Sequence, residues 1–310
     1  MVHPPQRFSF VGVTASASSI LRVFPRWVEL LALEPVDLLP LDLPLDSNRA
    51  TYRRVLHDIR DDPRHVGGLV TTHKVRLLHA ARDLFDAFDD YAQLCDEVSC
   101  ISKRDGRVIG HAKDPITSGR ALEELLAADH FGVSGGEVIC LGAGGAGLAI
   151  AVYLQARRHD DRPARVTIVD RDVNRLRTCR TVLAGVPSGS MTQHYVMSDH
   201  AARNDDVVAA AAPGSLIINA TGMGKDQPGS PVTGAVTFPT GAVVWELNYR
   251  GELEFLRQAR AQADARDLTV EDGWRYFIHG WSEVMAEVFG IELTAQVLHD
   301  LSAAAAEVRS

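Results

Sequence analysis

The chain lacks an excess of positive charge and any long uninterrupted hydrophobic run. Among its 310 residues, 32 lysines and arginines stand against 40 aspartates and glutamates, a net charge of −8. A nucleic-acid or anionic-membrane surface would need a basic face, and a membrane helix would need about 20 consecutive apolar residues. The first residues, MVHPPQRFSF, show no apolar signal-peptide core. We therefore predict a cytoplasmic protein with no nucleic-acid or membrane partner.

Cysteine is also scarce. The four cysteines, Cys95, Cys100, Cys140 and Cys179, do not have the paired spacing of a zinc site or of a disulfide framework. We interpret them as reduced packing residues, and we predict no metal.

Strand-like and helix-like segments alternate along the chain, which is typical of an α/β architecture. At this length two domains are expected. An N-terminal α/β substrate domain is predicted at 1–115, completed by C-terminal helices from 273 to 310. A doubly wound, Rossmann-type dinucleotide domain is predicted between them, at 116–272. Predicted elements include strands at 67–72, 98–102 and 107–111 and helices at 86–94 and 146–158.

A glycine-rich loop carries the strongest chemical signal. The apolar segment 137–141 runs into Gly142-Ala143-Gly144-Gly145-Ala146-Gly147, a helix follows, and Asp170 ends the next predicted strand, 23 residues after Gly147. This context matches the dinucleotide fingerprint, in which glycines allow a tight turn and close approach of a pyrophosphate to a helix N-terminus. We predict that this loop binds a nicotinamide dinucleotide.

The choice between NAD and NADP is expected to depend on Asp170, Arg171 and Asp172. A carboxylate there accepts hydrogen bonds from the adenosine ribose and opposes a 2′-phosphate, whereas an arginine favours that phosphate. Two carboxylates against one guanidinium favour NAD, with NADP left open.

Five motifs occur together in a characteristic order: VTTHK ending at Lys74, GHAKD ending at Asp114, the GAGGAG loop, NATGM from Asn219 to Met223, and Asn248-Tyr249. In this order and spacing the chain resembles the shikimate/quinate dehydrogenases over about residues 8 to 290. The resemblance implies that Lys74 and Asp114 flank a reacting hydroxyl in a cleft between the domains. It also implies that Asn219, Ala220, Thr221 and Met223 border the cofactor.

A lysine and an aspartate suit that chemistry on physical grounds. Oxidation of a secondary alcohol needs removal of the hydroxyl proton, and a lysine can accept it if its pKa falls from about 10.4. Because a neighbouring carboxylate opposes that fall, Asp114 would chiefly position Lys74 and hold the hydroxyl. Lys74 as a free base and Lys74 as one link in a proton relay both stay open.

The predicted substrate shell departs from the family pattern. The resemblance implies substrate contacts from Ser16, Ser18, Thr71, Ser99 and Tyr249. Ser99 replaces the usual asparagine, and Ala112 and Lys113 replace an asparagine and a threonine. A site that hydrogen-bonds hydroxyls discriminates strongly when partners change. The sequence therefore does not assign shikimate itself, and we expect a related hydroxylated carbocycle or another small hydroxy acid.

Three further side chains have alternative interpretations. His73 is expected to be solvated or to cap a helix, with a proton relay beside Lys74 as the alternative, and His111 is expected to lie on a strand face, with ligand contact as the alternative. Lys113 would pair with Asp114, supply a second cation for an acidic substrate, or lie on the surface.

We therefore predict an NAD(P)-dependent oxidoreductase that acts on a secondary hydroxyl of a small hydroxylated, carboxylated carbocycle. Two alternatives are another two-domain Rossmann enzyme similar to methylene-tetrahydrofolate dehydrogenase and a non-catalytic ligand sensor on the same fold. A homodimer is left open.

Overall fold

The structure is a computed structural model that describes residues 4–156, 161–187, 189–225 and 227–309. The chain divides into two compact units. Unit 1 comprises Met1–Asp114 and Ile278–Ser310, and unit 2 comprises Pro115–Phe277. The ends of the predicted domains at 1–3 and 310, and residues 157 and 158 of the predicted helix 146–158, lie outside the described residues.

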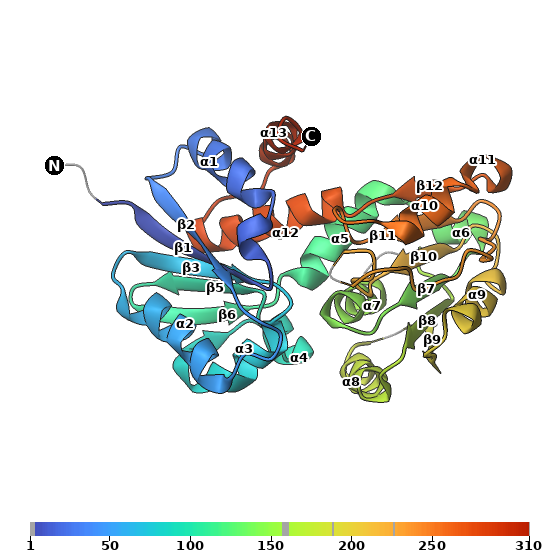
Figure 1. Ribbon diagram of the computed structural model, residues 1–310, viewed down its shortest axis with the longest axis horizontal. Helices are drawn as coiled ribbons and strands as arrows, with labels where there is room; N and C mark the ends of the chain where they lie inside the picture. The colour runs from blue at the N-terminus through green and yellow to red at the C-terminus, as the bar shows by residue number, and fades with distance from the viewer. Residues whose placement is uncertain (1–3, 157–160, 188, 226, 310) are drawn as a thin grey trace. The chain divides into compact units, whose positions relative to one another are not determined.

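A six-stranded mixed sheet forms the centre of unit 1, with strand order β2-β1-β3-β5-β6-β4 (Figure 1). Its strands are β1 (Gln6–Gly12), β2 (Val36–Asp42), β3 (His65–Val70), β4 (Ala87–Phe88), β5 (Cys100–Arg104) and β6 (Arg107–His111). The strands β2, β1 and β3 are parallel, whereas β5 runs antiparallel to both β3 and β6. Consequently β3 and β6 point the same way, and both end at the same edge of the sheet.

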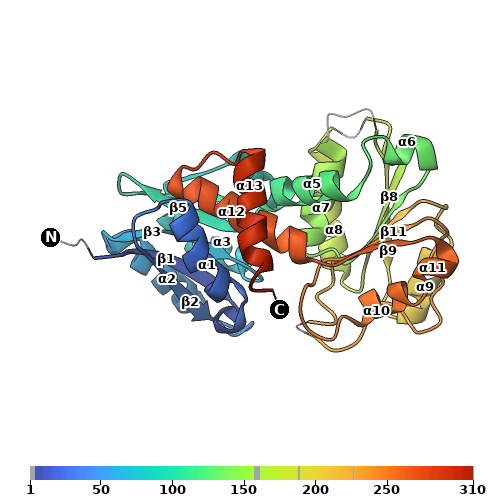
Figure 2. The same cartoon turned by 90° about the horizontal axis from the view of Figure 1, so that it is seen from above.

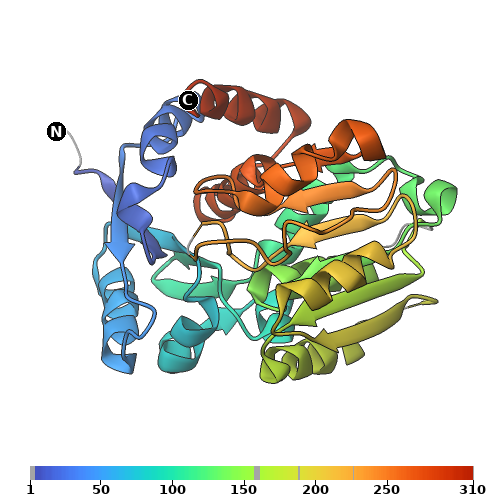
Figure 3. The same ribbon diagram turned by 45° about the vertical axis from the view of Figure 1, so that its right-hand side comes forward.

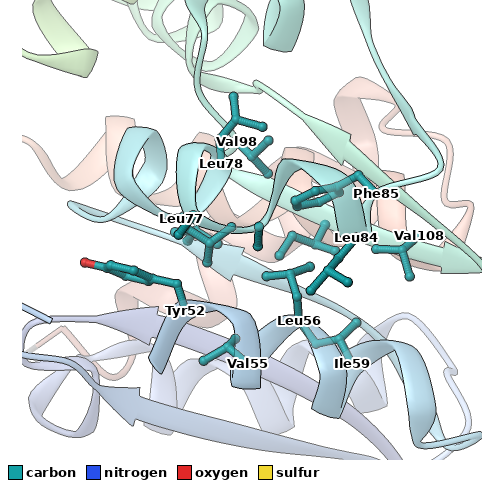
Figure 4. Packing of buried hydrophobic residues seen from close by; sticks show 14 of the residues in the cluster. Tyr52, Val55, Leu56, Ile59, Leu77, Leu78, Leu84, Phe85, Val98 and Val108 are labelled. Carbon is teal, nitrogen blue, oxygen red and sulfur yellow. The ribbon is translucent and has the colours of Figure 1, made fainter. Parts of the chain in front are cut away.

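Apolar side chains of unit 1 fill the space between this sheet and its helices. The helices are α1 (Ile20–Leu30), α2 (Arg49–Asp61), α3 (Lys74–Ala81), α4 (Asp90–Cys95) and α13 (Ala295–Ala306), with 3-10 turns η1 (Ala15–Ala17) and η2 (Arg82–Leu84). Figure 4 shows one such cluster, in which Leu56 and Ile59 of α2 meet Leu77 of α3. Burial of each such side chain contributes about 1.5–3 kcal/mol, so this cluster holds α3, and with it Lys74, on the sheet.

The C-terminal segment packs on the N-terminal part of unit 1. Helix α13 lies beside α1 (Figures 1 and 2), and the indole Nε1 of Trp27 donates to the Leu301 carbonyl over 2.9 Å. Trp281, on α12 (Trp274–Phe289), meets Phe10 edge-on with ring centroids 4.9 Å apart. Residues after 277 therefore complete the core that begins at β1.

Unit 2 contains a six-stranded parallel sheet of order β12-β11-β10-β7-β8-β9, whose strands appear side by side in Figure 3. Its strands are β7 (Val138–Leu141), β8 (Arg165–Asp170), β9 (Thr192–Met197), β10 (Leu216–Asn219), β11 (Val243–Glu246) and β12 (Thr269–Glu271). Numbered from β7, the order is 3-2-1-4-5-6, the doubly wound arrangement of Rossmann folds. The predicted α/β fold class with a Rossmann-type unit is thus confirmed.

Helices connect the strands of unit 2 and also carry the chain between the units. The helices are α5 (Asp114–Leu125), α6 (His130–Ser134), α7 (Gly145–Ala156), α8 (Val173–Ala184), α9 (Ala201–Ala209), α10 (Glu254–Arg260) and α11 (Ala263–Arg266). Both boundaries between the units fall within or at the start of a helix, α5 at Asp114 and α12 at Ile278.

Short elements account for the errors in the predicted secondary structure. The helix predicted at 86–94 is wrong in its first part, because Ala87–Phe88 form β4 and Asp89 caps α4 by accepting from the Ala92 N–H over 2.7 Å. Strand β12 and helix α6 were not predicted, since three to five residues are too few to show a periodic pattern.

Candidate active site

Lys74 and Asp114 form an ion pair in unit 1. Lys74 begins α3 shortly after β3, and Asp114 begins α5 shortly after β6. Because β3 and β6 end at the same edge of the sheet, two residues forty positions apart come into contact. Their side chains are only 16% and 12% exposed, so the predicted pair is present in a largely desolvated place.

A strained turn delivers Lys74 to this position. Thr72 has a φ of +58°, and the His73 N–H donates to the Thr71 carbonyl over 2.5 Å, which closes a three-residue turn. A positive φ is costly for a β-branched residue. The surrounding contacts hold the turn: the Thr71 N–H donates to the Val11 carbonyl over 2.9 Å.

The side chain of His73 supports the same turn. It is neither solvated nor a helix cap, so the prediction of a solvated or capping histidine was wrong. Its ring is buried, with Nδ1 2.8 Å from the Tyr52 hydroxyl and Nε2 2.9 Å from the Leu43 carbonyl. Burial lowers the pKa of His73, so the ring is neutral at neutral pH and is held as a structural bridge.

The charges around Lys74 decide its protonation state. Burial alone would lower the pKa of Lys74, but the carboxylates of Asp114 and Glu97 outweigh burial and raise it above its usual value. Lys74 is thus an ammonium group at neutral pH in the resting pair. Of the two roles left open by the sequence, this protonation state favours a proton donor or relay over a free base.

Glu97 is a neighbour of this pair that sequence reasoning missed. It lies between α4 and β5, is 1% exposed, and its Oε1 has no hydrogen-bond partner among the described residues. Burial raises the pKa of Glu97 to about 7, with Lys74 opposing and Asp114 adding to the shift. Its only sequence signal was an acidic residue directly before the apolar start of a strand.

Ser99 connects the segment that contains Glu97 to the end of β3, which leads to Lys74, and to the residue that precedes Asp114. Its carbonyl accepts from the Val70 N–H at the end of β3, and its hydroxyl accepts from the Lys113 N–H, both over 2.8 Å. Ser99 is buried. Its hydroxyl is therefore already engaged with the backbone beside Asp114.

The predicted serine pair lies after β1, at the same sheet edge. The backbone N–H and the hydroxyl of Ser16 both donate to the carboxylate of Asp42 at the end of β2, the former over 2.9 Å. These two hydrogen bonds, the hydroxyl first, lower the pKa of Asp42. Ser18 is buried, and its hydroxyl lies 3.4 Å from the Ile20 N–H. Ser16, which was expected to donate to a substrate carboxylate, thus already donates to the carboxylate of Asp42.

The observed contact of Lys113 agrees with none of its three interpretations. Its Nζ lies 2.6 Å from Glu287 of α12, and only 11% of its side chain is exposed. His111 is also buried, with Nε2 2.8 Å from the Ser102 hydroxyl. Lys113 therefore attaches the end of β6 to α12 instead of pairing with Asp114.

In unit 2 the glycine loop has the geometry that a dinucleotide requires. Gly142 has a φ of +112°, and a Cβ there would meet the Ala220 carbonyl at 2.6 Å. A Cβ on Gly147 would collide with the Gly142 carbonyl, whereas a Cβ on Gly144 would meet nothing within 4 Å. The loop is therefore closely packed at Gly142 and Gly147 and open at Gly144. Helix α7 begins one residue after Gly144, and the backbone N–H groups of its first turn are of the kind that bind phosphates.

Asp170, Arg171 and Asp172 follow β8 as predicted, but the two carboxylates have protein partners. Asp170 accepts from the Ala143 N–H over 2.7 Å and from the Asp172 N–H over 2.8 Å. Asp172 caps α8 through the Asn174 N–H over 2.8 Å. Arg175 lies 4.0 and 3.9 Å from the two carboxylates and is, with Arg171, a second cation in this segment.

The NATGM loop follows β10, next to the glycine loop. The Asn219 Oδ1 accepts from the N–H and the hydroxyl of Thr221, over 3.1 and 2.6 Å. Glu246, fully buried at the end of β11, accepts from the side chains of Asn219 and Asn248, each over 2.6 Å. Burial raises the pKa of Glu246 to about 7 despite these bonds. This network holds the loop, including Met223, at the carboxyl ends of β10 and β11.

Tyr249 also belongs to unit 2. Its ring packs against Phe277 at 4.4 Å and Trp274 at 5.6 Å between centroids. It is thus part of an aromatic cluster, whereas the other four predicted substrate contacts belong to unit 1.

Among the described residues, no three histidine, cysteine, aspartate or glutamate side chains gather as a metal ion would require. None of the described helices has the length and apolar character needed to cross a bilayer. All four cysteines are buried and unpaired.

Fold and site together define a class: a two-unit α/β protein in which one unit has the Rossmann topology with a dinucleotide-type glycine loop and the other carries a buried lysine–aspartate pair.

Known proteins of similar sequence are shikimate dehydrogenases. The NADP(+) enzyme of Streptococcus gordonii is 32% identical over 187 residues, which are 57% of this chain and 58% of that protein. The enzyme of Symbiobacterium thermophilum is 28% identical over 225 residues, 71% of each chain. The chain thus spans about three fifths of the length of the first relative. No protein-family model matches it.

Solved structures with the same fold cover almost the whole chain. They are 5-ketofructose reductase of Gluconobacter (TM-score 0.70, 21% identity, covering 97% of this chain and 98% of that one), shikimate 5-dehydrogenase of Thermus thermophilus with NADP(H) and shikimate (0.70, 21%, 97% and 99%), and quinate dehydrogenase of Corynebacterium glutamicum with NAD (0.71, 20%, 98% and 99%). At this identity the structures show the fold alone. The sequence matches confirm the resemblance predicted from the motifs: the chain is similar to shikimate dehydrogenases.

Proposed function

We propose that the protein is an NAD(P)-dependent oxidoreductase that interconverts a secondary hydroxyl and a carbonyl on a small hydroxylated carbocycle. The observation that carries the proposal is the desolvated Lys74–Asp114 ion pair at the sheet edge of unit 1. The named activity of the relatives of similar sequence supports it.

In this proposal Lys74 and Asp114 handle the oxygen and its proton. The ammonium group of Lys74 donates a hydrogen bond to the substrate oxygen and gives up a proton to it as a carbonyl is reduced. Asp114 holds the ammonium group in place and accepts a hydrogen bond from the hydroxyl. In the oxidative direction the ammonium group of Lys74 first releases a proton to solvent, and the resulting neutral amine receives the hydroxyl proton.

The cofactor would be held by unit 2. The loop from Gly142 to Ala146 and the N-terminus of α7 would bind the pyrophosphate, and residues 170–172 would face the adenosine ribose. The NATGM loop would border the nicotinamide, which when bound accepts or supplies a hydride. Dinucleotides bind at the point where the strand order reverses, and here that point lies between β7 and β10, where both loops emerge.

A direct test is a spectrophotometric screen at 340 nm. The protein is incubated with NAD or NADP and with shikimate, quinate and related cyclic polyols, with and without a carboxylate. We expect cofactor reduction with at least one ring substrate. Turnover with methylene-tetrahydrofolate instead would favour the folate-enzyme alternative. Ligand binding without turnover, by any compound of the screen, would favour the sensor.

Cofactor preference is a second expected result. A 2′-phosphate placed about 4 Å from a carboxylate meets a cost of roughly 4 kcal/mol at an effective dielectric near 20, before screening. Arg171 and Arg175 would recover part of it, so we predict that kcat/KM with NAD exceeds that with NADP by at least about tenfold. Steady-state kinetics with both cofactors measure it.

The variant Asp172→Ser sharpens this prediction, because serine keeps the cap on α8 but removes one charge. We expect the preference for NAD to shrink. Asp264→Ser, an exposed carboxylate on α11 of the same unit, is the control. A preference for NADP in the unmodified protein would contradict the prediction.

Substrate charge gives a third prediction. A carboxylated ring bound through Ser16 would lie beside Asp42, so Asp42→Asn is expected to lower KM for carboxylated substrates by about two- to fivefold, the scale of an exposed charge interaction. Asparagine can still accept from the Ser16 N–H. Asp37→Asn, at the opposite end of β2, is the control, and an equal change in both variants would rule out a local effect.

We also propose that the protein forms a homodimer and is located in the cytoplasm. Light scattering of the purified protein tests the first, and fractionation of the producing cells tests the second.

A further inference from the structure

A buried carboxyl group beside the Lys74–Asp114 pair is not used by the proposed chemistry. Glu97 belongs to the segment between α4 and β5. Since β5 runs antiparallel to β3 and β6, its start lies at the sheet edge where those two strands end. The strand order alone therefore brings Glu97 to the residues that follow β3 and β6.

Burial makes Glu97 unusual. It is 1% exposed, and its Oε1 has no hydrogen-bond partner among the described residues. A buried carboxylate without partners is costly, so a structural role would normally satisfy both oxygens. By contrast, Glu246 in unit 2 is also buried but accepts hydrogen bonds at both of its oxygens.

We propose, on the basis of the proposed function, that Glu97 is a positioning residue whose charge sets how firmly Lys74 holds its proton. With Glu97 ionised, Lys74 faces two carboxylates, and its ammonium form is favoured. With Glu97 neutral, Asp114 is the remaining carboxylate of the three side chains that opposes deprotonation of Lys74. The burial of Glu97 places its own change of charge close to neutral pH.

Other ionisable groups near the three side chains do not compete for this role. Cys95, at the end of α4, is buried, and burial raises the pKa of its thiol to about 12, so it is neutral. Asp89 is engaged at the start of α4, where it accepts from the Ala92 and Ala112 N–H groups. Glu97 is thus the group whose charge varies near neutral pH beside Lys74.

The test compares the unmodified protein with Glu97→Gln, which keeps the shape and removes the charge. Asp96→Asn, the adjacent and half-exposed carboxylate, is the matched control. The pH profile of kcat/KM for carbonyl reduction is expected to lose an inflection near neutral pH in Glu97→Gln. Its alkaline limb should shift downward by about one pH unit, as expected for loss of one nearby opposite charge.

A second measurement does not depend on activity. Acylation of Lys74 as a function of pH, read by peptide mass spectrometry, reports its protonation directly. We expect the midpoint for Lys74 to fall by about one unit in Glu97→Gln, while Lys113, paired with Glu287, serves as an internal reference. Glu97→Asp should move the midpoint back toward that of the unmodified protein.

The outcomes separate the two proposals. An unchanged Lys74 midpoint would overturn the role of Glu97, even if the variant lost activity through misfolding or misplacement. A shifted midpoint in a protein that reduces no ring ketone would support the role of Glu97 in setting the charge of Lys74 and contradict the proposed function instead.

Discussion

Replacing Lys74 with alanine is expected to lower kcat by about two to four orders of magnitude, the usual contribution of a proton-transferring side chain. The physical reason is that Lys74 is the cation of the pair and its side chain is mostly buried. Without it, no group of the pair can donate a proton to the forming alkoxide. Steady-state kinetics in both directions with the substrate found in the screen measure the loss.

The same variant should bind NAD as the unmodified protein does, because the glycine loop belongs to the other unit. Fluorescence titration of the cofactor checks this. Arg54→Ala removes an exposed cation from α2 of unit 1 and serves as the matched control, with near-normal turnover expected. Near-normal turnover in Lys74→Ala would mean that Lys74 does not transfer the proton.

Asp114→Asn should lower kcat/KM by about two orders of magnitude or more. Asparagine keeps the shape and one acceptor but removes the charge that faces Lys74. Since Asp114 helps to raise the pKa of Lys74, its loss should move the alkaline limb of carbonyl reduction to lower pH. Below that limb Lys74 stays protonated in both proteins, so the difference between their profiles grows as pH rises.

The control for this variant is Asp105→Asn, in the exposed turn between β5 and β6, where asparagine tolerates the positive φ of 51°. A weaker KM with an unchanged pH profile would show that Asp114 binds the substrate without influencing proton transfer. Comparison with Glu97→Gln would then show which carboxylate dominates the charge of Lys74.

Local sequence patterns predicted much of this protein, because they depend on neighbours in the chain. The glycine loop is such a case: Gly142 needs its positive φ, and Gly147 lacks a side chain because the helix passes over the Gly142 carbonyl. The alternation of strands and helices predicted the Rossmann-type sheet for the same reason. The lysine–aspartate pair was predicted by resemblance, since forty intervening residues leave no local signal.

The sequence could not show which groups the ionisable side chains contact. Lys113 precedes Asp114 directly, yet it pairs with Glu287, 174 positions away. His73 was expected to be solvated, but Tyr52 and the Leu43 carbonyl enclose it. Such partners come from other strands and helices, and which of them meet depends on the strand order of the sheet.

The sequence by itself thus determined the fold class, and it predicted the glycine loop and, by resemblance, the Lys74–Asp114 pair. The tertiary structure decided that Asp42 engages Ser16 and that Glu97 lies buried beside Lys74. The physical reason is that charge states depend on desolvation and on the distance between groups far apart in the chain. The parallel pairing of β1 with β2 brings Ser16 to Asp42, and the antiparallel insertion of β5 between β3 and β6 brings Glu97 to the edge where Lys74 and Asp114 lie.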